Sequence, residues 1–88
     1  MTEKEICQAA GYLIRQAAGK AFKTVQVPCS VKSVGENDGV EIRSGYVSPL
    51  GPTLHYVAHG SVSGHRLRME TIQVIGVDDK AMPFSQFP

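Results

Sequence analysis

Residues 1–18 alternate apolar and polar side chains with the period of an amphipathic helix. The apolar positions recur at spacings of three and four, and they include Ile6, Ala10, Leu13 and Ala17. Thr2 and Glu5 have the spacing of a capping box, in which each side chain accepts a hydrogen bond from the other residue's backbone N–H. The pattern predicts a helix over about residues 3–18, followed by Gly19 as its C-terminal stop.

From residue 22 onward the period changes to two, which is the repeat of a strand with one buried face. Alternating runs separated by Gly, Pro, Ser and Asn clusters predict strands at about residues 22–34, 40–47, 53–62 and 65–77. Pro28 lacks the N–H that a central strand needs, so we expect the first strand at a sheet edge or with a bulge. Residues 78–88 form an extended tail that we expect to dock on its own domain or on a partner.

A short loop determines how the last two strands pair. Ser63–Gly64 fits a two-residue hairpin loop, which would place Val62 opposite His65. Beyond Thr71 the apolar positions change parity along the strand. A bulge, or burial on both faces, explains that change.

These elements predict a single α+β domain spanning residues 1–88. An N-terminal helix packs on a four-stranded antiparallel meander sheet, and the extended C-terminal tail follows. The sheet face beneath the helix is expected to hold Val25, Val27, Val31, Ile42, Tyr46, Leu54, Tyr56, Leu67 and Met69. A chain of this length buries only about 60 to 65% of its unfolded surface, so a partner covering a further face would stabilise it.

The composition favours a soluble domain in a reducing compartment. Nine Lys and Arg against eight Asp and Glu give a net charge of +1, too little for non-specific binding to nucleic acid or an anionic membrane. The sequence contains no run of about 18 apolar residues and no signal-peptide pattern, so we expect a cytoplasmic protein without membrane contact. Cys7 and Cys29 are expected to be thiols packed in the core, since a disulfide is geometrically possible but disfavoured in the cytoplasm.

The second sheet face, away from the helix, is rich in titratable side chains: Glu41, Arg43, His55, His59, Arg66, Arg68 and Glu70. If Tyr46 pairs with Leu54, Glu41 falls opposite His59, and the hairpin register places His59 opposite Arg68. Such a row could orient a histidine for acid–base chemistry. The favoured interpretation is a solvated face with cross-strand charge pairs, and no catalytic residue is assigned.

Other chemistries have little support. His55 and His59 lie about 13 Å apart along a strand, too far to share a metal ion, and we expect neither a metal nor a cofactor. No glycine-rich turn leads from a strand into a helix, which argues against a phosphate loop. Nucleic-acid binding through Arg43, Arg66 and Arg68 remains a weak alternative, because no aromatic platform accompanies them.

The leading hypothesis is a non-enzymatic module that acts through protein–protein association, either with itself or with a larger protein. An accessory or inhibitor protein of a phage or another mobile element would have such a sequence. The candidate interface consists of apolar side chains left over once the helix face is filled: Val57, Ile72, Val74, Met82, Phe84 and Phe87. The alternative is a small enzyme or ligand-binding domain that uses Glu41, His59 and Arg68 at a dimer cleft.

Overall fold

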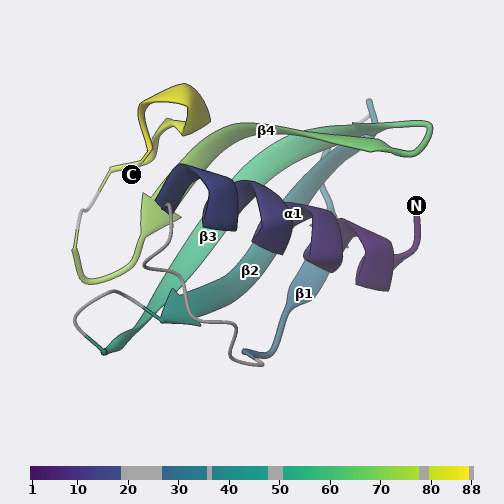
Figure 1. Cartoon of the computed structure of the whole chain (residues 1–88). Coiled ribbons are helices and arrows are strands. Elements are labelled where there is room, and N and C mark those ends of the chain that lie inside the picture. The colour runs from purple at the N-terminus through teal and green to yellow at the C-terminus, as the bar shows by residue number, and fades with distance from the viewer. Residues whose placement is uncertain (19–26, 36, 48–50, 78–79, 88) are drawn as a thin grey trace.

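One helix packs across one face of a five-stranded antiparallel sheet in the computed structural model of this chain (Figure 1). The structure describes residues 1–18, 27–35, 37–47, 51–77 and 80–87. The helix α1 spans Glu3–Ala18. The strands follow one another in the sheet in chain order, and they are β1 (Ser30–Ser33), β2 (Gly39–Val47), β3 (Thr53–Ser63), β4 (Arg66–Val74) and β5 (Met82–Pro83). The predicted helix on an antiparallel meander is therefore confirmed, with five strands rather than four.

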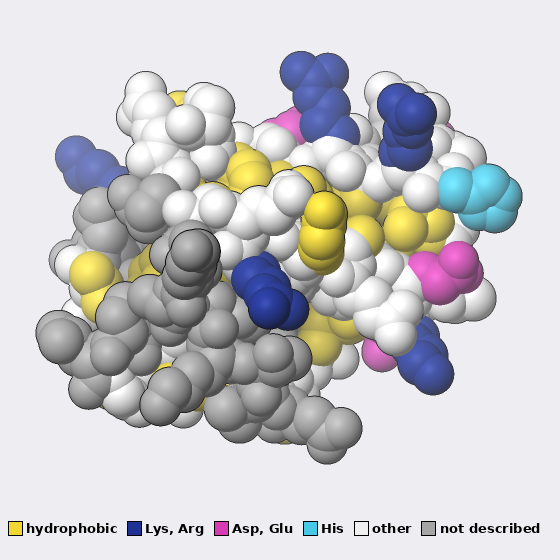
Figure 2. All heavy atoms as spheres, viewed as in Figure 1, with side chains coloured by type: hydrophobic (Ala, Val, Ile, Leu, Met, Phe, Trp, Pro, Cys, Tyr) yellow, Lys and Arg dark blue, Asp and Glu magenta, His cyan; other side chains and the backbone are white. Residues whose placement is uncertain are grey.

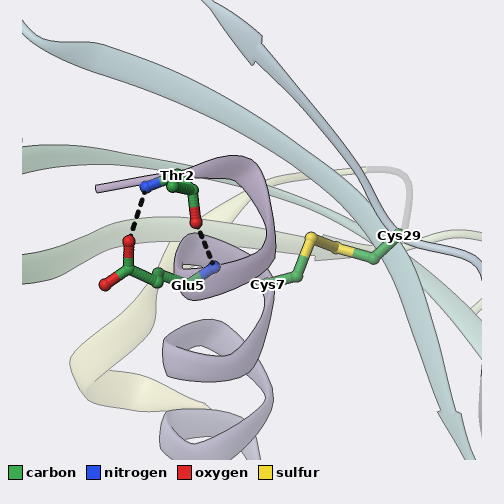
Figure 3. Close-up of a disulfide and its surroundings, with 4 residues drawn as sticks. All are labelled: Thr2, Glu5, Cys7 and Cys29. Carbon is green, nitrogen blue, oxygen red and sulfur yellow. Dashed lines mark hydrogen bonds between the residues drawn. A yellow bond between two sulfur atoms is a disulfide. The ribbon is translucent and has the colours of Figure 1, made fainter.

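The helix begins at the predicted capping box. The Thr2 N–H donates to Glu5 Oε1 over 2.9 Å, and the Glu5 N–H donates to Thr2 Oγ1 over 3.2 Å (Figure 3). Ile6 and Ala10 are buried as predicted, and Ile14 is only 1% exposed. The buried stripe thus passes through Ile14. The predicted stop at residue 19 lies outside the described residues.

The two outermost strands are the least like their predictions. β1 begins at Ser30, later than expected, and the part of the predicted strand at residues 22–26 lies outside the described residues. Pro28 precedes β1, which lies at the edge of the sheet as that proline indicated. β5 pairs Met82 and Pro83 with Ile72 and Thr71, so the tail contributes an edge strand that the sequence pattern did not predict.

The predicted hairpin register between β3 and β4 is wrong. Ser63 faces Arg66 and the loop consists of Gly64 and His65, so Val62 lies opposite Leu67 rather than His65. Gly64 has a φ of 60°. One common class of two-residue hairpin loops needs this left-handed conformation at its first position, and glycine adopts it without strain.

A bulge in β4 produces the change of parity that the sequence indicated. The register shifts between His59 and Gly60, which pair with Thr71 and Met69, so Glu70 is the extra residue on β4. The bulge lies just before the expected position. It directs the following apolar side chains of β4 toward the helix, where Ile72 is 0% exposed.

Several side chains predicted to form an interface are therefore internal. Ile72, Val74 and Phe87 belong to the buried core, and Met82 and Phe84 are partly buried against it. The Phe87 ring packs edge-on against Tyr46, with 6.1 Å between centroids, and stacks on Phe84 at 5.8 Å. The tail docks on its own domain. The bulge turns the β4 side chains toward the helix and the tail folds back onto the core, so these residues are not available as an interface.

The core lies between α1 and the sheet. Its largest fully buried side chains come from three elements, Ile14 of α1, Ile42 of β2 and Ile72 of β4. Figure 2 shows the helix side, on which hydrophobic side chains surface in a band beside α1 and several charged side chains project from the rim. The helix therefore covers the apolar face of the sheet incompletely.

The two cysteines form a disulfide, so their prediction as free core thiols is wrong. Cys7 points from α1 toward Cys29, in the segment that leads into β1, and their Cα atoms are 6.2 Å apart (Figure 3). That separation lies within the usual range for a disulfide. The cross-link joins the first half of the helix to the edge of the sheet.

Candidate functional site

The sheet face opposite α1 carries the candidate site, because no other helix in the described part of the chain covers it (Figure 1). Strand alternation places every second residue of β1 to β4 on this side. We call this surface the open face, and its side chains include Lys32, Glu41, Arg43, His55, Val57, His59, Arg66, Arg68, Thr71 and Gln73. The structure therefore brings most of the predicted site residues onto one surface.

Glu41 is the best-connected side chain of the open face. Arg43 Nε–H donates to Glu41 Oε2 over 3.2 Å, and His59 Nε2 lies 3.1 Å from Glu41 Oε1. The carboxylate side chain is 18% exposed, whereas those of Arg43 and His59 are 60% and 45% exposed. The hydrogen bond from Arg43, assisted by His59, holds the pKa of the Glu41 carboxyl below its ordinary value. Glu41 is therefore a carboxylate whose charge is already paired.

The predicted pairing of Glu41 with His59 is confirmed, but the extension of that row to Arg68 is wrong. β3 presents His59 opposite Thr71, and Arg68 lies opposite Ser61. The displaced hairpin loop shifts the register by two residues, so Arg68 falls toward the turn, and the bulge shifts it by one more, which places Thr71 rather than Glu70 opposite His59. The row across the sheet instead consists of Lys32, Glu41, His59 and Thr71.

Sequence reasoning missed two partners of this row. It placed Arg43 on the face but did not pair it with Glu41, although residues two apart on one strand share a face. It also did not pair Lys32 with Glu41, although β1 places these two residues directly opposite each other. Alternation along β2 places Arg43 beside Glu41, and alignment of β1 with β2 places Lys32 opposite Glu41.

The open face is cationic. Lys32, Arg43, Arg66 and Arg68 lie on it. The carboxylate of Glu41 is engaged by neighbours, and Glu70 lies in the bulge. Among the described residues of this surface, positive charge therefore exceeds negative charge, although the whole chain has a net charge of only +1.

A shallow depression of about 370 Å³ lies on the open face beside the paired carboxylate. The side chains that matter for its chemistry are Val27, Pro28, Arg43, His55, Val57 and Ile75. Neither Glu41 nor His59 lines it, so the proposed acid–base row does not face this depression. A cationic group and an imidazole accompany several aliphatic side chains, which suits a ligand with both an apolar and an anionic part.

A second depression, of about 430 Å³, lies between the start of α1 and the turn that joins β1 to β2. Asp38 is the charged side chain of its lining. The capping box already satisfies backbone N–H groups at this helix end. Among the described residues, no group of three or more His, Cys, Asp or Glu could hold a metal ion.

The chain matches no protein-family model, no curated protein and no solved structure. Within the described ranges, no helix is both long and apolar enough to cross a membrane.

Proposed function

We propose that this chain is a non-enzymatic protein-binding module whose open face docks on an acidic surface of a larger protein. The observation that carries this proposal is the excess of positive charge on a sheet face that no described helix covers. Complementary charge steers association and selects against partners of like charge. An acidic protein surface is the partner that fits such a face.

Self-association through this face is the weaker form of the hypothesis. Two copies meeting there would bring Lys32, Arg43 and Arg68 against the same cations of the second copy, which is unfavourable. The apolar side chains that favoured self-association are now largely internal, since Ile72 and Phe87 belong to the core. A partner of opposite charge is therefore the better fit.

Nucleic acid is a less suitable partner than an acidic protein. The described open face carries no Phe, Tyr or Trp on which bases could stack. Duplex DNA serves as a competing probe in the test.

The disulfide supports an oxidising compartment for this function. Disulfides persist in secreted and extracytoplasmic proteins and are rare in the cytoplasm. The Cys7–Cys29 bond therefore weighs against the cytoplasmic location that the low cysteine count suggested. Mass spectrometry after alkylation of the protein from its native source should find no alkylated cysteine.

The test compares two variants with the same change in net charge. Arg43→Glu/Arg68→Glu reverses charge on the open face, and Lys4→Glu/Arg15→Glu reverses it on exposed positions of α1. Calorimetric titration with hexaglutamate at low salt is expected to show binding that weakens about tenfold in the open-face variant and much less in the helix variant.

Equal weakening in the two variants would overturn the proposed role of the open face. Tighter binding of a short duplex DNA than of hexaglutamate, lost in the same open-face variant, would transfer the function to nucleic acid. Light scattering that shows a dimer dissociated by the open-face substitutions would instead identify a second copy as the partner.

A further inference from the structure

The depression on the open face has an apolar lining on two sides. Val27 and Pro28 come from the segment before β1, whereas Val57 belongs to β3 and Ile75 follows β4. Ile75 is 52% exposed, one of the few large hydrophobic side chains that the fold leaves in solvent. An apolar group placed in the depression would shield these side chains from water.

Two polar side chains at the same depression have nitrogen atoms that make no hydrogen bond with a described residue. Arg43 bonds Glu41 through Nε, so its two terminal nitrogens have no partner among the described residues. The exposed His55 ring likewise has no described partner. A guanidinium edge with free N–H groups matches a carboxylate.

Gly45 lets the walls approach each other. A Cβ at this position would lie 3.1 Å from Val27 Cγ1 and 3.3 Å from His55 Nδ1. It would also lie 2.7 Å from the Leu54 carbonyl oxygen, closer than real Cβ atoms approach a backbone oxygen. The absence of a side chain at Gly45 therefore allows both Val27 and His55 to pack close to the β2 backbone.

The disulfide holds one wall in place. Cys29 lies between Pro28 and Ser30, both of which line the depression, and it is bonded to Cys7 of α1. β1 is an edge strand of only four residues, so sheet pairing alone anchors this segment weakly. Because this wall is already fixed before a ligand binds, less conformational entropy is lost on binding.

We propose that this depression is the point at which the acidic partner is anchored, an inference that rests on the proposed function. The depression takes an aliphatic side chain of the partner, while a neighbouring Asp or Glu carboxylate binds the terminal nitrogens of Arg43. The site therefore recognises a short sequence in the partner, an aliphatic residue beside an acidic one, rather than acidic charge alone.

The test uses two tripeptides blocked at both ends, glutamyl-leucyl-glutamate and glutamyl-alanyl-glutamate, titrated into ¹⁵N-labelled protein. The leucine peptide is expected to bind about tenfold more tightly than the alanine peptide, because the larger side chain buries more apolar surface. The largest amide shifts are expected around Arg43, His55 and Ile75.

A matched pair of variants locates the preference. Ile75→Ser is expected to abolish the advantage of the leucine peptide and to leave the alanine peptide unaffected. Val77→Ser removes a neighbouring side chain that is 67% exposed and does not line the depression, so it should change neither affinity. Both positions are exposed, so both variants should fold.

Equal affinity for the two peptides, or equal loss of the leucine preference in the two variants, would overturn the anchor. If both peptides bind equally and still shift the open face, the acidic-partner function stands without an anchor. If the peptides shift only α1, the anchor and the proposed function both fail.

Discussion

The two faces of the sheet use alternate residues of the same strands for different purposes. On β2, Ile42 is completely buried beneath the helix, whereas Glu41 and Arg43 lie on the open face. The helix-side face is apolar and cross-linked to α1, whereas the open face is charged and carries no described helix. Substitutions at adjacent residues of one strand should therefore differ in effect: those on the helix-side face should change the free energy of unfolding, and those on the open face should change partner binding.

The largest difference is expected between Ile42→Ala and Arg43→Ala. Removing the fully buried Ile42 side chain leaves a cavity and should cost about 3 to 4 kcal/mol in the free energy of unfolding. Removing the exposed Arg43 side chain should cost less than about 1 kcal/mol. Urea unfolding of both variants measures the contrast, and similar losses would contradict the division between the faces.

The disulfide on the helix side should have the next largest effect. Cys7 and Cys29 are 22 residues apart in sequence, and closing a loop of that length stabilises the folded state by about 3 kcal/mol. The variant Cys7→Ser/Cys29→Ser should unfold at correspondingly lower urea. A loss below about 1 kcal/mol would show that the cross-link does little to hold α1 against β1.

Alkaline pH should destabilise the helix-side face through Tyr56. Burial raises the pKa of this phenol to about 12, and a hydrogen bond with Ser44 partly opposes the rise. Because the folded pKa exceeds the ordinary value of 10, the stabilisation is complete below pH 10 and is lost as pH rises toward 12. The loss should be on the order of 2 to 3 kcal/mol.

The measurement is the free energy of unfolding between neutral and alkaline pH in the wild type and in Tyr56→Phe. The phenylalanine variant should lose less stability over this range. Identical pH profiles would show that the Tyr56 phenol is not protected by the core.

Acid should produce a smaller effect on the open face through Glu41. Hydrogen bonding from Arg43 lowers the pKa of Glu41, so its stabilisation is present above the ordinary value of 4.5 and is lost as pH falls through the lower folded value. Wild type should be more stable than Glu41→Gln near neutral pH, and the difference should vanish in strong acid. Glu70→Gln removes a carboxylate at an exposed position in the bulge and controls for the loss of one negative charge near neutral pH.

Local patterns predicted the parts of the fold that depend on neighbouring residues. The capping box of Thr2 and Glu5 located the helix start, and alternation around the β2–β3 connection correctly paired Glu41 with His59. Each of these inferences depends on spacing within one element or across one loop.

The features that were predicted wrongly are the β3–β4 register, the disulfide and the position of the tail, and residue spacing alone does not determine them. Moving the hairpin loop to Gly64 and His65 shifts the register, so Arg68 leaves the Glu41 row, and the bulge at Glu70 shifts it again, so Thr71 joins that row. The disulfide was missed because cysteine count indicates a compartment and says nothing about which helix face meets β1. The tail was expected to dock on its own domain or on a partner, but Phe87 was assigned to an interface because it reaches the core only after the chain turns back at β5.

The central claim is that the open face, and not the helix side, meets an acidic partner. The chain has three histidines, and two of them, His55 and His59, lie on the open face. His65 lies in the β3–β4 loop, on the side of the molecule where α1 begins at Glu3. The three imidazoles therefore report on two sides of the molecule.

The most direct measurement is an NMR titration of these imidazole signals with hexaglutamate. The signals of His55 and His59 are expected to shift in a saturable, salt-sensitive way while that of His65 stays in place. Shifts of His65 equal to or larger than those of His55 and His59 would contradict the central claim.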